Sequence, residues 1–343
     1  MAAKYKIIGP NDLVSTRTLL HEAIPITGTI VSGTYASDGN IHNYSHGMFQ
    51  SVYDYPYLSS SANHIFDVTV GYSNDSDLSS STNSQNTKKI NIYNQMAQVL
   101  VGYSASGSIR DFDRDGDLSG GTKHKECIFL NFARLLTKDE IKKQSFNLSF
   151  FTGGTPVARS GPIKTISDYG AATNYKVNSP AGEYGILYSG SEATAGTGVG
   201  LLYYQAGVAV LTGSIFDGEF GANAAPYDTG SFKIVLTGSE ISASADGVRN
   251  RWLNLEFNNT TELNSTIYFC RAMHNDFNYS SNPTYLSSSQ IRVKNTRKDQ
   301  SKAYITAIGL YGPDNALLAV AKLSEPVAKD PSMETMFRVR LDY

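Results

Sequence analysis

The sequence is poor in cysteine and in charge, and each shortage excludes a class of protein. Two cysteines in 343 residues, Cys127 and Cys270, cannot form the disulfide framework of a small secreted domain. Both lie in apolar runs, so we expect buried thiols. Charged residues make up 17% of the chain and the formal net charge is −2, so no nucleic-acid-binding surface is predicted. The densest basic stretch, residues 292–302, is interpreted as a solvated loop.

Long apolar runs are also missing. No run of about 18 consecutive apolar residues, the length of a membrane-spanning helix, occurs. The first 25 residues have no apolar segment followed by a small-residue cleavage site, so a secretory signal peptide is not expected. The sequence therefore predicts no membrane span and synthesis in a cytoplasm.

The common catalytic motifs do not occur either. We find no G-x-x-x-x-G-K-[ST], G-x-G-x-x-G, H-E-x-x-H or G-x-S-x-G. The fold could still bring together two carboxylates for glycoside cleavage, because such residues need not be neighbours in sequence. With 31 acidic residues, no particular pair is indicated. We predict a non-enzymatic protein with no catalytic residue and no cofactor.

What the sequence does contain is alternation of apolar and polar residues, the pattern of half-buried antiparallel strands. The clearest runs are residues 66–70, 146–150, 232–236, 253–257 and 337–343. Residues 200–216 and 304–324 each hold two apolar runs around a turn, which predicts hairpins. In the last strand, Phe337, Val339, Leu341 and Tyr343 share one face, which we expect to be buried. The fold class predicted is mainly β: antiparallel β-sandwich or partly open barrel units.

One or two short helices are expected within this β fold. Residues 88–102 place Tyr93, Met96, Ala97 and Leu100 on one helical face. Thr137 and Glu140 match a capping box that would open a short helix ending at Lys143. The pattern over residues 239–251 is ambiguous.

Polar stretches separate the patterned segments and suggest how the chain is organised. They cover residues 73–85, 153–180 and 190–200. The middle stretch is long for a loop inside a compact domain, so we place a boundary near residue 155. This predicts an N-terminal β-rich domain over 1–155 and a C-terminal antiparallel β domain over 156–343. Loops 73–85 and 153–180 are expected to become ordered on contact with neighbouring chains.

The sharpest local motif is DFDRDGD, in which Asp111, Asp113, Asp115 and Asp117 alternate with other residues and Gly116 allows a tight bend. Carboxylates at loop positions 1, 3 and 5 with glycine at 6 open a calcium-binding loop. Position 12 is Thr122 instead of glutamate, and no amphipathic helix precedes the loop. We interpret the segment as an acidic surface turn, with these four residues as a weak calcium candidate and no metal predicted.

Two further residue sets were weighed. His42 and His46 lie four apart near Asp38 and Asp54, a spacing that would face both imidazoles to a metal on a helix. The surrounding residues are poor helix formers, so a metal site is not predicted, and His64, His124 and His274 stand alone. The 22 tyrosines suit either strand faces and subunit interfaces or a carbohydrate-binding face.

The C-terminal part of the chain resembles a known group of proteins. The runs AYITAIGLYGPDNALLAVAKLSEPVAKD (303–330), FRVRLDY (337–343) and FCRAMHNDFNYSSNPTYLSSS (269–289) carry the resemblance. They resemble C-terminal segments of virion structural proteins of tailed bacteriophages, especially contractile-tailed phages of the T4-like and marine cyanophage type. The resemblance covers about 75 residues and implies no catalytic residue.

The resemblance implies a scaffold or connector in the tail, baseplate or neck of a virion, assembled in the host cytoplasm. Its partners would be other virion proteins and copies of itself. The alternative is a fibre or receptor-binding protein that recognises glycan on the host surface. A glycan-cleaving enzyme is a third possibility, which would need a carboxylate pair in a cleft.

Overall fold

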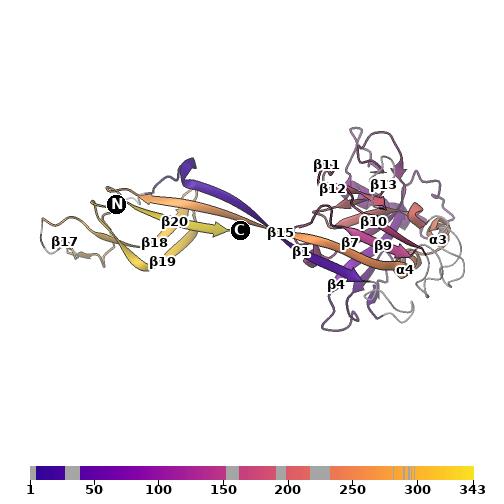
Figure 1. The fold of residues 1–343 in the computed structure, drawn as a ribbon, viewed down its shortest axis with the longest axis horizontal. Helices are drawn as coiled ribbons and strands as arrows, with labels where there is room; N and C mark the ends of the chain where they lie inside the picture. The colour runs from indigo at the N-terminus through magenta and orange to yellow at the C-terminus, as the bar shows by residue number, and fades with distance from the viewer. Residues whose placement is uncertain are drawn as a thin grey trace. The chain divides into compact units, whose positions relative to one another are not determined.

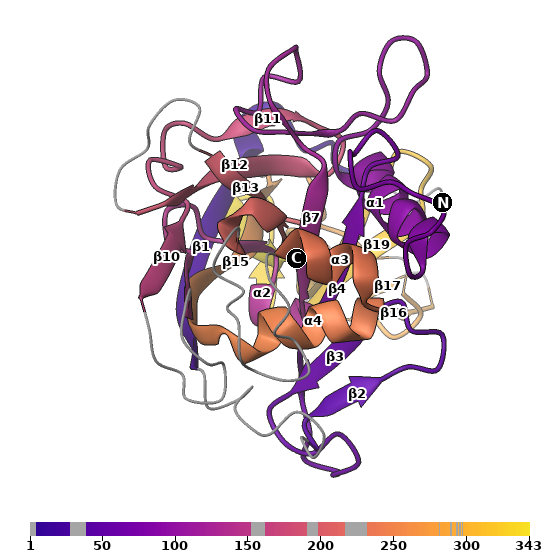
Figure 2. The same cartoon turned by 90° about the vertical axis from the view of Figure 1, so that its right-hand side faces the viewer.

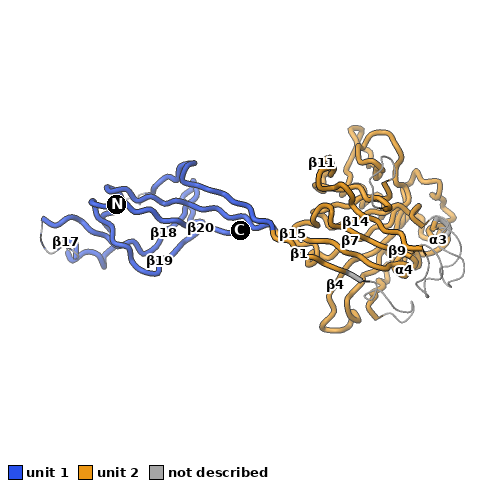
Figure 3. Tube along the Cα trace, viewed as in Figure 1, with its two compact units in different colours: residues 1–19, 262–343 blue, residues 20–261 orange. Residues whose placement is uncertain are grey.

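The computed structural model describes residues 5–27, 39–151, 162–190, 198–216, 232–280, 282–288, 290–292, 294, 296 and 298–343. The chain divides into two compact units (Figure 3). Unit 1 consists of residues 1–19 and 262–343, and unit 2 of residues 20–261. The predicted boundary near residue 155 lies outside the described residues, and the units divide at 19/20 and 261/262 instead.

Unit 2 is a mainly antiparallel β structure with helices on its sheet, so the predicted mainly β fold class is confirmed (Figure 1). The helices of unit 2 are α1 (Asn86–Leu100), α2 (Arg134–Thr137), α3 (Phe232–Gly238) and α4 (Ile241–Asn250). Its strands up to residue 151 are β2 (Ile41–Asn43), β3 (Gln50–Tyr53), β4 (His64–Tyr72), β5 (Phe112–Asp113), β6 (Lys123–His124), β7 (Glu126–Phe132), β8 (Glu140–Ile141) and β9 (Asn147–Phe151). Its later strands are β10 (Ile163–Ser167), β11 (Lys176–Ser179), β12 (Gly182–Ser189), β13 (Gly198–Tyr203) and β14 (Val208–Thr212).

The strand order in unit 2 is β9-β10-β12-β13-β14-β7-β4-β3-β2, and β15 (Trp252–Ala272) pairs with β9 through its first residues. The hydrophobic core lies entirely among residues 41–257. At its centre Trp252 is fully buried, and its ring stacks on Phe66 with 4.6 Å between centroids. The contact between these two rings thus helps to hold β4 and β15 together.

Helices cover both faces of the sheet around β4 (Figure 2). On one face, α1 lies so close that a Cβ on Gly71 would stand 2.6 Å from the carbonyl oxygen of Lys89, so only glycine fits. On the other face, Gln50 Nε2 of β3 donates to Asp246 Oδ1 of α4 at 2.6 Å. Because side chains alternate along a strand, Val68, the partner of Gln50, and Gly71 point to opposite faces.

Unit 1 is built from strands that precede and follow unit 2. Its strands are β1 (Leu13–Thr27) and β15, which both also contribute residues to unit 2, with β16 (Leu286–Ser287), β17 (Gln290–Ile291), β18 (Ala303–Tyr311), β19 (Leu317–Lys329) and β20 (Thr335–Asp342). In unit 1, β15 pairs with β20 over Ser265–Ala272, and β18 forms a separate hairpin with β19. The hairpin predicted over 304–324 is confirmed, as is the strand over 337–343.

The predicted burial of that last strand is wrong for the single chain. Phe337 and Val339 are half-buried, while Leu341 and Tyr343 are exposed, Tyr343 by 71%. Alternation along the strand predicted the shared face correctly, but the described residues of unit 1 cover that face only in part.

Two segments take a different secondary structure from the one their pattern predicts. Residues 232–236 form helix α3 instead of a strand, and the buried residues Phe232, Val235 and Leu236 follow the helical spacing. The capping box at Thr137 does not open a helix, because Lys138 has φ 55° and Ile141 pairs with β15 in strand β8. Residues 239–251, which were ambiguous, form α4.

Several smaller predictions also have outcomes. The helix over 88–102 is confirmed as α1, with Tyr93, Ala97 and Leu100 buried. Loop 73–85 forms turns with hydrogen bonds such as Ser76 N to Ser73 O at 3.0 Å, because its short polar side chains suit turns, and its ordering on contact with neighbouring chains stays a prediction. Cys127 is buried in β7 and Cys270 is only half-buried. None of the helices among the described residues could cross a membrane.

Candidate functional site

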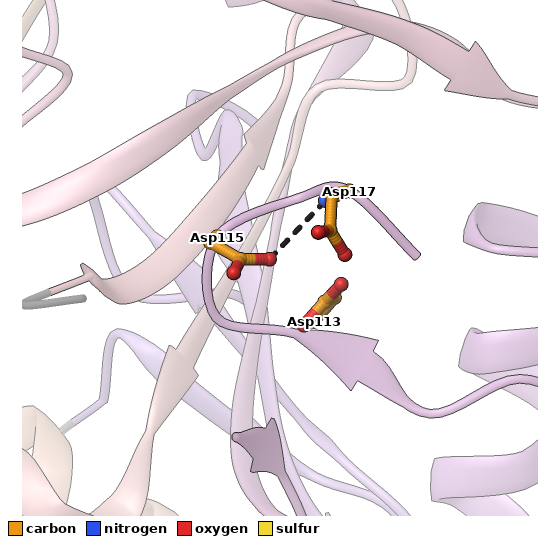
Figure 4. Close-up of side chains that lie close together, drawn as sticks. All are labelled: Asp113, Asp115 and Asp117. Atoms are coloured by element: carbon orange, nitrogen blue, oxygen red, sulfur yellow. Dashed lines mark hydrogen bonds between the residues drawn. The ribbon is translucent and has the colours of Figure 1, made fainter. Parts of the chain in front are cut away.

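The acidic loop predicted from sequence connects β5 with β6 in unit 2 (Figure 4). Oxygens of Asp113, Asp115 and Asp117 all lie within 4.8 Å of one another, and only Asp113 is buried. The fourth predicted residue, Asp111, points elsewhere and accepts hydrogen bonds from Ser73 Oγ and Tyr93 Oη, both at 3.0 Å. Across the part of the chain that the structure describes, no other three His, Cys, Asp or Glu residues come together in this way.

A lysine already occupies the place of a cation in this loop. Lys123 Nζ lies 3.0 Å from Asp113 Oδ1, and the backbone N–H of Leu118 donates to Asp113 Oδ2 at 2.7 Å. Burial raises the pKa of Asp113, while Lys123 acts in the opposite direction. The N–H of Ser119 donates to Asp117 Oδ1 at 2.7 Å and lowers the pKa of Asp117. The carboxylates therefore hold the turn, which supports the interpretation as an acidic surface turn.

We predict that the loop does not bind calcium tightly in the native chain. Calorimetric titration of calcium into the chelator-treated protein should give no micromolar affinity. Lys123→Met removes the competing charge and should strengthen calcium binding by about tenfold or more, as expected for removal of a close like charge. Micromolar affinity in the native chain, lost in an Asp113→Asn/Asp115→Asn variant, would contradict the prediction.

The histidines weighed as metal ligands lie in a cluster of rings instead. His42 stacks on Tyr57 with 4.5 Å between centroids and an interplanar angle of 7°, and lies 4.1 Å from Tyr44. His46 stacks on the same Tyr44 ring at 5.1 Å, and its Nδ1 accepts a hydrogen bond from the N–H of Met48. Asp38 lies outside the described residues. Each imidazole thus has an aromatic neighbour, and His46 has one ring nitrogen engaged.

The cluster continues along β2, β3 and the start of β4. We call it the ring patch. The centroid of each ring lies 4.1–6.3 Å from that of at least one other member, and the members are His42, Tyr44, His46, Phe49, Tyr53, Tyr57 and His64. Every member is half-buried or exposed. Rings that contact one another yet keep an open face are available for stacking with a ligand.

Polar side chains at the centre of the same sheet face adjoin the ring patch. Ser51 Oγ donates to Asp67 Oδ1 at 2.5 Å, and His64 Nε2 contacts the same oxygen at 2.8 Å. Asn131 Nδ2 reaches the other oxygen, Oδ2, only at 3.5 Å. Tyr44 Oη lies 3.3 Å from Ser51 Oγ and so joins the rings to this polar group. Asp67 Oδ2 therefore has capacity to accept a further hydrogen bond.

This serine, histidine and aspartate do not form a nucleophilic triad. In a triad the imidazole lies between the hydroxyl and the carboxylate and takes the proton of the hydroxyl. Here Ser51 and His64 both contact Asp67 Oδ1, so the serine hydroxyl is bonded to the carboxylate directly. The arrangement suits binding of polar groups better than covalent catalysis.

A polar cleft of about 310 Å³ lies beside the ring patch. It is lined by Ser81, Asn83, Gln85, Asn86, Thr87 and Lys88, at the beginning of α1. Lys88 Nζ donates to the carbonyl oxygen of His46 at 2.9 Å, and a Cβ on Gly47 would lie 3.6 Å from Gln85 Nε2. The cleft lining therefore contacts the turn that carries His46.

No known protein-family model, curated protein or solved structure matches this chain.

Two further histidines do not belong to the ring patch. His124 is buried beside the acidic loop, where burial and the charge of Arg114 lower its pKa to about 4. His274 is largely exposed, 3.5 Å from Glu334.

Proposed function

We propose that this chain is a non-enzymatic structural subunit of a tailed-phage virion, a scaffold or connector of the tail, baseplate or neck that associates through unit 1. The observation that carries the proposal is the exposed apolar surface of unit 1. The phage-like segment 269–343 lies within unit 1, so the resemblance and this surface fall on the same residues. Ser51 and His64, which share one carboxylate oxygen, support a role without covalent catalysis.

Unit 1 leaves most of its apolar side chains in contact with solvent. Among its described residues, the only buried apolar ones are Ala272 and Ala303. Unit 1 is less than a third of the chain, yet it holds 18 of the 30 exposed large hydrophobic residues found in the part of the chain that the structure describes. Isolated subunits rarely expose so much apolar surface unless another molecule covers it.

The interior of unit 1 is polar. Lys329 is fully buried, and its Nζ donates to Asn278 Oδ1 at 2.7 Å and to the carbonyl oxygen of Asp330 at 2.9 Å. Asp276, 5% exposed, accepts from Lys6 Nζ at 3.2 Å. These bonds fix the strands and loops of unit 1 but bury little apolar area, so they contribute little hydrophobic stabilisation.

We assign the covering partner to further copies of this chain. A surface that must be covered for unit 1 to be stable needs a partner present wherever the chain is made, and another copy meets that requirement. Most soluble oligomers are built from copies of one chain. Leu318 and Val320, exposed by 72% and 55%, alternate on one face of β19 and supply apolar contacts for such an interface.

The test is the mass of the protein in solution. The native chain should be oligomeric by light scattering at micromolar concentration, and Leu318→Glu/Val320→Glu should dissociate it. Both side chains are exposed in the single chain, so the variant should change the stability of unit 2 by less than about 0.5 kcal/mol. Tyr55→Glu/Leu58→Glu, which introduces two charges at exposed apolar positions of unit 2, is the matched control and should remain oligomeric. A monomeric native chain would contradict the assignment to copies of itself.

The alternative, a receptor-binding protein of a phage fibre, is favoured by one specific observation. The rings of the ring patch are exposed or half-buried, and beside them Asp67 and Asn131 are half-buried and Ser51 is buried. Such a surface suits ligand recognition, and the two roles are compatible because they use different units.

A further inference from the structure

We infer that the ring patch, with Ser51, Asp67 and Asn131 beside it, is a binding site for a neutral oligosaccharide. The site lies wholly in unit 2 and goes beyond the proposed structural role, on which it does not depend. It would bind several pyranose rings, with the polar cleft at its edge taking the hydroxyl groups of a terminal unit.

The rings supply the stacking surface that a sugar requires. The C–H face of a pyranose is apolar and packs on an aromatic ring, whose face carries partial negative charge. Tyr57 is 36% exposed, and the ring of its partner His42 lies parallel to it. Tyr44 and His46 form a second parallel pair at 5.1 Å. Two parallel pairs on one surface suit a chain of sugar rings better than a single small ligand.

The polar groups have the donor and acceptor types that sugar hydroxyls pair with. Asp67 Oδ2 has only the 3.5 Å contact with Asn131, so it can accept a bond from a sugar hydroxyl. Asp67 is held in place by Ser51 and His64, which reduces the cost of ordering it on binding. A fixed carboxylate with amide and hydroxyl neighbours, beside aromatic rings, gives orientation as well as affinity.

The polar cleft extends this chemistry past His46. Its lining consists of two hydroxyl groups, three amides and one lysine, with no carboxylate. Gln85 is fixed because its Oε1 accepts the N–H of Ile241 at 3.0 Å. Asn86 is fixed because its Oδ1 accepts the hydroxyl of Tyr72 at 2.5 Å. Amides anchored by their oxygens present N–H groups to a ligand hydroxyl.

The charges around the ring patch argue for a neutral ligand. A nucleic acid also stacks bases on aromatic rings, but its binding needs several lysines or arginines for the phosphates. Next to the patch, the positive charge of Lys88 is outnumbered by the negative charges of Asp54 and Asp67. The pKa of Asp54 is lowered even though burial opposes this, because Asn63 donates two hydrogen bonds, at 2.6 and 2.8 Å. Both carboxylates repel a polyanion.

The experiment titrates the full chain with maltohexaose, cellohexaose and chitohexaose, followed by calorimetry and ligand-observed NMR. At least one should bind with a Kd below about 5 mM. Tyr57→Ala should weaken that binding about 3- to 10-fold, the amount expected for one stacked ring, whereas Tyr57→Phe, which keeps the ring, should bind as the native chain does. Tyr57 lies in a surface loop, so neither change threatens folding.

Tyr169→Ala is the matched control, since Tyr169 is 46% exposed elsewhere in unit 2, and it should not alter binding. Failure of all three hexasaccharides to bind at about 10 mM would overturn the inference. Unchanged binding by Tyr57→Ala, or an equal loss with Tyr169→Ala, would also overturn it. None of these outcomes bears on association through unit 1, which light scattering tests separately.

Discussion

Replacing Asp168 with alanine is expected to lower the free energy of unfolding of unit 2 by about 3–5 kcal/mol. Asp168 is 1% exposed and follows β10. Its Oδ2 accepts the N–H of Gln144 at 2.6 Å and the hydroxyl of Tyr204 at 3.0 Å, and its Oδ1 accepts the N–H of Phe146 at 3.0 Å. Alanine leaves these three donors without an acceptor in the interior, and unpaired buried donors are costly.

Urea unfolding followed by tryptophan fluorescence measures this loss, because Trp252 is the only tryptophan and lies in the core of unit 2. Asp77→Ala, at an exposed position, is the control and should change the free energy by less than about 0.5 kcal/mol. Asp168→Asn keeps the shape and one acceptor, so its loss should be intermediate. An Asp168→Ala variant as stable as the Asp77→Ala control would show that the three donors find other partners.

Removing residues 335–343 should replace the proposed oligomer with aggregates without unfolding unit 2. Strand β20 pairs with β15 from Ser265 to Ala272, so its loss leaves that edge of β15 unpaired. An unpaired strand edge promotes aggregation. The core of unit 2 ends at Phe257 and contains no residue of β20. Unit 1 should therefore lose its native structure, whereas the stability of unit 2 should change little.

Two measurements separate these effects. Sedimentation of the truncated chain should show large aggregates in place of the proposed oligomer. The Trp252 fluorescence transition on heating should stay within about 2 °C of the native value, since the free energy of unit 2 is unchanged. A lowered Trp252 transition would mean that unit 2 depends on β20.

Most strands could be predicted from alternation, and the exceptions have identifiable physical causes. Phe66, Val68 and Val70 are buried in β4 as their pattern requires, since one face of that strand meets the core. Residues 232–236 satisfy the strand and the helix spacing at once, because five residues are too few to separate the two periods. Helix α3 packs against α4 and against residues 213–216, and only the fold brings these segments together.

The division into units could not be predicted, because it depends on which distant strands pair. A boundary in a polar stretch near residue 155 assumes that each unit is one continuous segment. Unit 1 instead joins β1 to β15 and β20 across more than two hundred residues. Composition along the chain carries no signal for such pairing.

The candidate site was partly visible in the sequence. His42 and His46 have the spacing of residues on one face of a helix. In extended backbone, alternate residues also share a face, so His42 and Tyr44 point the same way. That alternation would have indicated a row of rings. Asp67 and Asn131 could not have been added, because their meeting depends on the pairing of β4 with β7.

The discontinuous layout of unit 1 also sets an order of events during translation. Residues 5–19 leave the ribosome before unit 2 but cannot complete unit 1 until residues 262–343 follow, whereas unit 2 is synthesised in between as one continuous segment. Domains fold as their residues emerge, so unit 2 can reach its native state while its neighbour on the chain is still incomplete. The exposed apolar surface of unit 1 then forms only after unit 2 has been synthesised. The proposed association of copies through unit 1 can therefore begin only after the larger unit of each chain has had time to fold.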